Sequence, residues 1–152
     1  MDIDQDSPGV SFPPPFVFIG TLLVGLAIDR FSWLPIRFPL GEMVERGVGW
    51  LAIVAGAGII LTAMGLFRKA GTRPEPWKPT TGIVTDGVYG WTRNPMYLGM
   101  ALIYAGIALL FDSVIALALL VPAVLVIQRQ VIEREEAYLE GKFGEPYRSY
   151  KA

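Results

Sequence analysis

Four stretches of the chain are almost entirely apolar, and polar segments separate them. They run over 15–28 (with 31–36 behind Asp29 and Arg30), 48–67, 96–111 and 114–127. Roughly 20 apolar residues in a helix cross a bilayer core about 30 Å thick. The pattern therefore predicts an all-α fold, a polytopic membrane helix bundle with about four transmembrane helices.

The connections predict how these helices are arranged. Only Asp112 and Ser113 separate the last two stretches, so we expect a tight hairpin of two antiparallel neighbours. The last stretch continues through Gln128 and Arg129 into a charged segment, which predicts a C-terminal helix beyond the membrane surface. Within the second stretch, the small residues at 56–58 predict close packing against a neighbouring helix.

Basic residues indicate which membrane face each connection occupies, because cytoplasmic connections carry an excess of Lys and Arg. The long loop after the second stretch contains Arg68, Lys69, Arg73, Lys78 and Arg93, and the tail contains Arg129, Arg134, Lys142, Arg148 and Lys151. The first loop has only Arg30, Arg37 and Arg46, and the hairpin turn has no basic residue. The sequence thus predicts a multi-pass integral membrane protein whose long loop, tail and N-terminus face the cytoplasm.

Composition narrows the chemistry. The 152 residues suffice for a single domain, and only 18% are charged, against about 25% in soluble domains. The chain has neither Cys nor His, which removes thiol chemistry, the commonest metal ligand and the usual general base, so we expect no metal site. The net charge is −1 and no basic run carries interleaved aromatics, so we expect no nucleic-acid partner. The acidic N-terminus lacks the positive region of a signal peptide.

Two polar segments are candidates for a site. The first, 78–99, combines four glycines and three aromatic residues with Arg93 near a predicted membrane edge, a pattern that also fits an interfacial anchor. The second, 132–150, carries Glu135 and Glu136 and also fits a solvated helix with internal ion pairs. The hairpin should bring both segments to one membrane face. Arg93 and the glutamates would then be neighbours, which favours a site for a small charged ligand.

The two segments together resemble the isoprenylcysteine carboxyl methyltransferase family and its relatives, the phospholipid methyltransferases. In that family Thr-x-Gly-x-Tyr leads to Arg-His-Pro-x-Tyr-x-Gly, and a membrane hairpin, Glu-Glu-x-x-Leu and Phe-Gly-x-x-Tyr follow. The matching residues here are Thr85, Gly87, Tyr89, Arg93, Asn94, Pro95, Tyr97, Gly99, Glu135, Glu136, Leu139, Phe143, Gly144 and Tyr147. The resemblance covers about 78–150. Asn94 replaces the family's His, and its amide can hold a ligand but cannot relay a proton.

The resemblance implies S-adenosylmethionine as cofactor. It implies catalytic roles for Arg93, Asn94 and Glu135. The cofactor-binding set that it implies is Thr85, Gly87, Val88, Tyr89, Arg93, Asn94, Pro95, Tyr97, Glu135 and Glu136. Arg93 would meet the cofactor's carboxylate, and a glutamate its amino group or ribose; the rotation of the helix leaves both Glu135 and Glu136 open for that role.

The implied partners are membrane lipids and a lipophilic small molecule or lipidated acceptor that reaches the site from the bilayer. Because the chain has no His, we expect an acceptor that needs no strong base, such as the carboxylate of an isoprenylcysteine-like substrate. Two other interpretations stay open. One is an NADPH-dependent enzyme similar to membrane sterol reductases, which share an Arg-His-Pro-x-Tyr segment in longer chains. The other is a non-catalytic membrane scaffold or accessory subunit.

Overall fold

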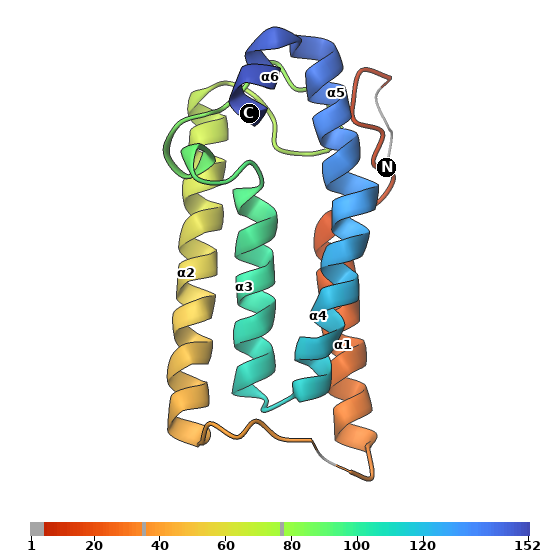
Figure 1. Cartoon of the computed structure of the whole chain (residues 1–152), viewed down its shortest axis with the longest axis vertical. Helices are drawn as coiled ribbons and strands as arrows, with labels where there is room; N and C mark the ends of the chain where they lie inside the picture. Colours follow the sequence, from red (N-terminus) through yellow and green to blue (C-terminus); the bar gives the residue numbers. More distant parts are fainter. Residues whose placement is uncertain (1–4, 35, 77) are drawn as a thin grey trace.

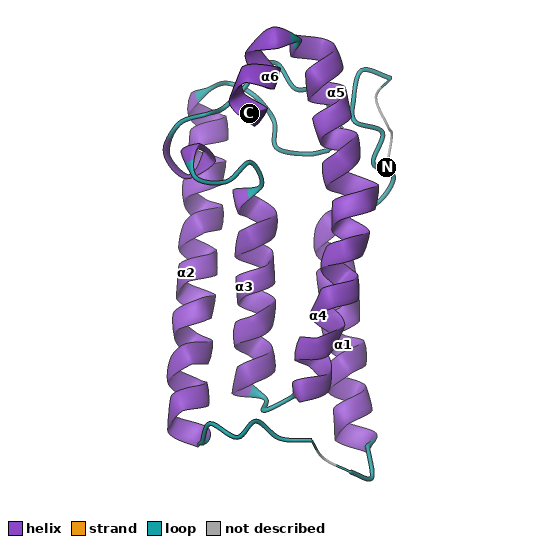
Figure 2. Ribbon diagram, viewed as in Figure 1, coloured by secondary structure: helices purple, strands orange, loops and turns teal. Residues whose placement is uncertain are grey.

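The computed structural model describes residues 5–34, 36–76 and 78–152, and these form helices without any strand (Figure 2). The elements in chain order are α1 (Pro14–Phe31), α2 (Glu42–Lys69), the 3₁₀ turn η1 (Gly87–Gly90), α3 (Pro95–Leu110), α4 (Val114–Ile127), the π-helical segment η2 (Gln128–Ile132), α5 (Glu133–Phe143) and α6 (Glu145–Lys151). Helices α4, η2 and α5 run on from one another (Figure 1). The prediction of an all-α fold is confirmed.

Within the described residues, three helices are long and apolar enough to cross a membrane. They are Pro14–Phe31, Glu42–Lys69 and the continuous Val114–Phe143; α3 is a shorter apolar helix. Many large apolar side chains lie exposed on the outside of the bundle, with Leu51, Val54 and Leu61 of α2 each at least 66% exposed. A surface of this kind suits lipid rather than water, so the fold is compatible with a multi-pass membrane protein.

The helix bounds depart from the apolar stretches at the membrane edges. Helix α1 continues through Asp29 and Arg30 to Phe31, and α2 begins at Glu42, six residues before Val48. Hydropathy marks the part of a helix that lies in the bilayer core, whereas the helix itself can extend into the headgroup region with charged side chains reaching water. The bounds of α4 agree with the predicted stretch.

Glycine contacts hold α2 against the antiparallel α3. A Cβ added at Gly56 would lie 2.5 Å from the carbonyl oxygen of Gly99, and a Cβ added at Gly106 would lie 2.5 Å from that of Gly49. Small residues at these positions let the two backbones approach closely. The packing predicted for 56–58 is therefore present at Gly56, whereas Gly58 has no neighbour within 4 Å of such a Cβ.

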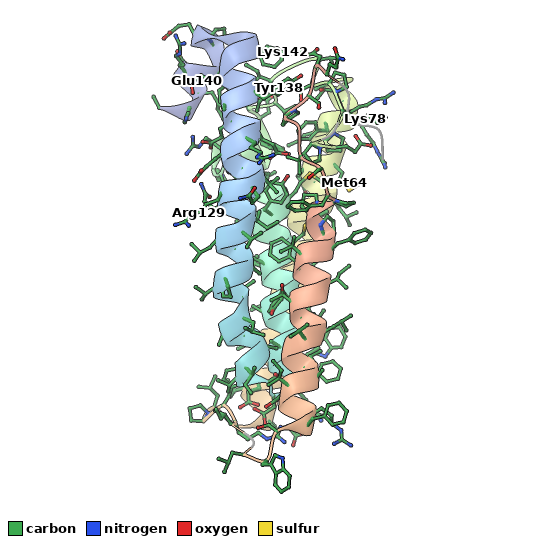
Figure 3. The ribbon with its side chains drawn as sticks, turned by 90° about the vertical axis from the view of Figure 1, so that its right-hand side faces the viewer. Met64, Lys78, Arg129, Tyr138, Glu140 and Lys142 are labelled. Carbon is green, nitrogen blue, oxygen red and sulfur yellow. The ribbon has the colours of Figure 1, made fainter. Side chains whose placement is uncertain are left out.

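Helix α1 packs mainly on α4, the second close pair of the bundle (Figure 3). A Cβ added at Gly25 would lie 2.5 Å from the Cα of Ala116. Helix α3 contacts both members of this pair, and its buried Tyr104 donates a hydrogen bond of 2.7 Å to the carbonyl oxygen of Ala116. The two helices of the hairpin, α3 and α4, are therefore neighbours, as predicted.

The two ends of the bundle carry different connections. At the hairpin end, Asp112 takes a positive φ of 48° and accepts hydrogen bonds from Arg37 and from the backbone N–H of Phe38, which ties the hairpin to the first loop. The N-terminal segment, the long loop 70–94, α5 and α6 gather at the other end (Figure 1). The two candidate segments therefore lie together, as the hairpin predicted.

Candidate functional site

The long loop folds back on itself directly after α2. Gly71 takes a positive φ of 67°, and the Thr81 hydroxyl donates to its carbonyl oxygen at 3.2 Å. The buried Thr72 accepts a hydrogen bond of 3.0 Å from the backbone N–H of Thr81. These bonds hold Thr81 beside Gly71 and Thr72, at the end of the bundle where α2 finishes.

Tyr138 of α5 joins three segments that are far apart in the sequence (Figure 3). Its hydroxyl accepts a hydrogen bond of 3.1 Å from the backbone N–H of Thr80 and donates one of 3.1 Å to the carbonyl oxygen of Asp6. Lys142, one turn further on, donates to the Asp6 carboxylate at 2.7 Å. The N-terminal segment and the long loop are therefore both fixed to α5.

A cavity lies between these segments. Its walls come from Pro8, from 73–76, Thr80 and 82–84 of the loop, from Tyr89 and 93–97, and from α5 and α6. The enclosed volume is about 100 Å³, so a larger ligand would also occupy the open mouth or displace part of the loop. The lining combines aromatic and apolar side chains with a few charged ones, the composition typical of small-molecule sites.

Glu135 of α5 carries the most perturbed carboxyl group of the cavity. It lies beyond the apolar part of its helix, and its Oε1 accepts a hydrogen bond of 2.8 Å from the Tyr97 hydroxyl. Burial raises the pKa of Glu135 from 4.5 to about 7; the bond from Tyr97 opposes this rise and the charge of Glu136 adds to it. At neutral pH this carboxyl group can therefore both hold and accept a proton.

Glu136, the next residue, is occupied by cations. Its Oε1 lies 3.0 Å from Nη1 of Arg93, and its Oε2 lies 3.5 Å from Nζ of Lys151. The Glu136 side chain is 14% exposed and that of Arg93 38%, so the guanidinium keeps further N–H donors on its open side. Both glutamates line the cavity, but Glu135 has the freer carboxylate, while Glu136 positions Arg93.

The other residues singled out in the sequence fall into two groups. Tyr89, Asn94 and Pro95 line the cavity beside Arg93, Tyr97 and the two glutamates. Thr85, Gly87 and Val88 lie just outside the cavity. Thr85 precedes η1, and Gly87 and Val88 are its first two residues. Gly87 needs its positive φ of 58° for that turn, and a Cβ there would meet Leu66 of α2 at 3.1 Å.

Comparison with known families places the chain. A family model described as phospholipid methyltransferase matches residues 44–146, which is more than half of the chain. The chain belongs to the phospholipid methyltransferase family. The matched region of this family member runs from the start of α2 into α6 and includes Arg93, Tyr97 and both glutamates; the N-terminal segment lies outside it.

Two curated relatives are similar to this member of the phospholipid methyltransferase family. Protein-S-isoprenylcysteine O-methyltransferase of Schizosaccharomyces pombe is 33% identical over 69 residues, which are 45% of this chain and 29% of the relative. An uncharacterized protein of Haemophilus influenzae is 43% identical over 56 residues, 37% of this chain and 89% of the relative. No solved structure matches the chain. The match spans less than a third of the Schizosaccharomyces enzyme, so that enzyme's activity does not transfer directly.

Several lining residues of this family member were not singled out as site residues in the sequence. They are Pro8, Phe67, Arg73, Glu75, Tyr147 and Tyr150. The Phe-Gly-x-x-Tyr motif already contained Tyr147, whereas Glu75 stands in a proline-rich part of the loop without any motif. The described residues contain no group of three or more acidic, His or Cys side chains placed to hold a metal ion.

Proposed function

We propose that this protein is an S-adenosylmethionine-dependent methyltransferase that acts on a lipophilic acceptor from the membrane. One observation supports this most strongly: Glu135 with Tyr97, and Arg93 with Glu136, meet around a single cavity at the end of an apolar bundle. Because the chain belongs to a methyltransferase family, we interpret this cavity as the site of methyl transfer. The basic residues of the loop and tail favour a cytoplasmic position for the site.

The side chains of the cavity suit S-adenosylmethionine. The open side of the Arg93 guanidinium offers a planar fork to a carboxylate, and Glu135 offers an acceptor to an ammonium group or a hydroxyl. The buried Oε2 of Glu75 has no hydrogen-bond partner among the described residues, and a donor on the ligand would supply one. Asn94 also lines the cavity, whereas Thr85, Gly87 and Val88 would contact only a part of the cofactor that extends beyond it.

The main task of the site is alignment. The bound cofactor supplies a methyl group on a positively charged sulfur. Alignment of two reactants contributes up to roughly 7–11 kcal/mol of a barrier, and it depends on side chains that cannot rotate away. Glu136 and Lys151 restrain Arg93, and Tyr97 restrains Glu135. These ion pairs and hydrogen bonds restrict the rotation of the two side chains that would align the reactants.

Glu135 widens the range of acceptors. The expectation of an acceptor that needs no base rested on the absence of His. A carboxyl group with a pKa of about 7 in the cavity can itself accept a proton at Oε2. A carboxylate acceptor, one of the groups that an O-methyltransferase such as the Schizosaccharomyces relative can methylate, would need no such transfer, whereas an ammonium acceptor would need it. We therefore propose a lipophilic acceptor of the isoprenylcysteine type and treat an amine lipid as the second candidate.

Binding of S-adenosylmethionine to the detergent-purified protein, measured by calorimetry, tests the proposal. Arg93→Ala and Glu135→Ala should each abolish saturable binding. Glu133→Ala and Arg129→Ala are matched controls, because both side chains are exposed on the same continuous helix and lie outside the cavity. Turnover is then measured in proteoliposomes with a prenylated cysteine carrying a free carboxyl group and, separately, with an amine lipid.

Other outcomes of this experiment favour the other interpretations. Binding of NADPH but not of S-adenosylmethionine would replace the proposal by the reductase. A folded wild-type protein that binds neither ligand would leave the non-catalytic scaffold. Binding that survives both Arg93→Ala and Glu135→Ala would move the site away from this cavity.

A further inference from the structure

Glu75 is the least satisfied carboxylate of the cavity. Its Oε2 is buried and has no hydrogen-bond partner within the described part of the chain, and no ion pair is present there either. The other two glutamates of the cavity differ from it, because Glu135 accepts a bond from Tyr97 and both oxygens of Glu136 face cations. A buried polar atom without a partner is rare in native proteins and calls for a specific explanation.

The surrounding chain holds Glu75 in place. Pro74 and Pro76 flank it and restrict the backbone on both sides, and its carbonyl oxygen accepts a hydrogen bond of 3.1 Å from the N–H of Lys78. Thr81 is held beside Gly71 and Thr72. The carboxylate is therefore kept at the cavity wall although it gains no protein partner there, which is the arrangement expected of a residue that meets a ligand.

We propose that Glu75 is a further binding residue of this site and that it accepts a hydrogen bond from the nucleoside part of the cofactor. The inference rests on the proposed function and adds a contact to it. A carboxylate is an acceptor only, so the ligand must present a donor, such as a ribose hydroxyl or the adenine amino group.

The distribution of charge in the cavity favours the nucleoside over the amino-acid part of the cofactor. Near Glu75 in the chain, the lining contains the apolar side chains of Pro74, Pro76 and Ile83. Among the described residues, Arg73 is the one cation of this segment that lines the cavity, whereas the proposed function already assigns the amino-acid part of the cofactor to Arg93 and Glu135, which belong to other segments. The adenine ring is weakly polar and carries an amino donor, so it suits the apolar lining beside Glu75.

Two ligands and two variants test this assignment. S-Adenosylhomocysteine carries both parts of the cofactor, while 5′-methylthioadenosine carries the nucleoside without the amino acid. Binding of each is measured by calorimetry on the whole protein in detergent, with Glu75→Gln, Glu75→Ala and the exposed Glu133→Gln as control. We expect both Glu75 variants to bind both ligands about tenfold more weakly or worse, because a hydrogen bond to a charged group is lost, and the control to bind normally.

Thermal unfolding without ligand separates binding from folding. The Oε2 of Glu75 has no protein partner, so Glu75→Gln should melt at the wild-type temperature or above it, while its stabilisation by S-adenosylhomocysteine falls. A lower melting temperature without ligand would assign Glu75 a structural role and overturn the inference.

The remaining outcomes are also decisive. Wild-type affinity in both Glu75 variants would refute the contact while leaving the proposed function intact. Weaker binding of S-adenosylhomocysteine alone would move the contact to the amino-acid part and refute the nucleoside assignment. If the wild-type protein binds neither compound, the proposed function itself fails, and this inference fails with it.

Discussion

Glu135→Gln should stabilise the protein above neutral pH while it removes cofactor binding. The wild-type carboxyl group has a pKa of about 7 in the folded protein, against an ordinary value of 4.5. The folded state therefore binds more protons than the unfolded state between these values, and stability falls as the pH rises from about 4.5 to 7. An uncharged amide of the same shape escapes this penalty and can still accept the Tyr97 hydrogen bond.

The size of the effect follows from the two pKa values. At 1.36 kcal/mol for each tenfold change in proton affinity, the ionised carboxylate costs at most about 3 kcal/mol above pH 7. This is an upper bound, because part of the side chain reaches solvent. For a chain of this length, about 3 kcal/mol corresponds to a rise in melting temperature of roughly 6–12 °C.

Thermal unfolding in detergent from pH 4.5 to 8.5 measures the difference between wild type and Glu135→Gln. We expect the two melting temperatures to converge at the acidic end and to separate toward pH 8. Since the chain contains no His, no other side chain ordinarily titrates between about pH 6 and 8.5. The exposed Glu133→Gln variant should follow the wild type throughout. Parallel curves for wild type and Glu135→Gln across the whole range would refute the raised pKa.

Two further predictions concern the scaffold. Gly99→Ala should lower the melting temperature and the yield of folded protein, because the new Cβ would lie 2.6 Å from Ile60 and 2.7 Å from the Gly56 carbonyl oxygen. Gly58→Ala is the control and should change neither quantity, because the space around Gly58 is open. Equal losses of melting temperature in the two variants would contradict the α2–α3 contact. Tyr138→Phe should expose the N-terminal segment to limited proteolysis at native temperature, because the hydroxyl that joins Asp6 to the loop is lost; an unchanged cleavage rate would show that the remaining contacts suffice.

Hydropathy and motif spacing predicted the architecture because both depend on local sequence. The bilayer thickness fixes how long an apolar helix must be, and the two residues at Asp112 and Ser113 leave no route other than a hairpin. That hairpin in turn brought Arg93 and Glu136 to one end of the bundle, where the two side chains form an ion pair at 3.0 Å. The site predictions themselves await the binding experiments.

Other features depend on contacts that no local pattern encodes. The π-helical segment η2 lies between α4 and α5, and an extra residue per turn there changes the direction in which the following side chains point. Helical periodicity therefore could not predict which of Glu135 and Glu136 would face the cofactor. Glu75 was missed for a different reason, since its importance lies in a hydrogen bond that is absent, and an absence of this kind is visible only in three dimensions.

The pairing of α1 with α4 also sets an order on biosynthesis. Helices α2 and α3 are successive hydrophobic helices and can insert together as one unit, whereas α1 emerges before them and meets its main partner only after both have been made. A nascent chain that stops before Val114 would contain the glycine contacts of α2 and α3 but would leave Gly25 without Ala116. The hydrogen bond and ion pair that fix Asp6 can therefore form only after α5 has been translated.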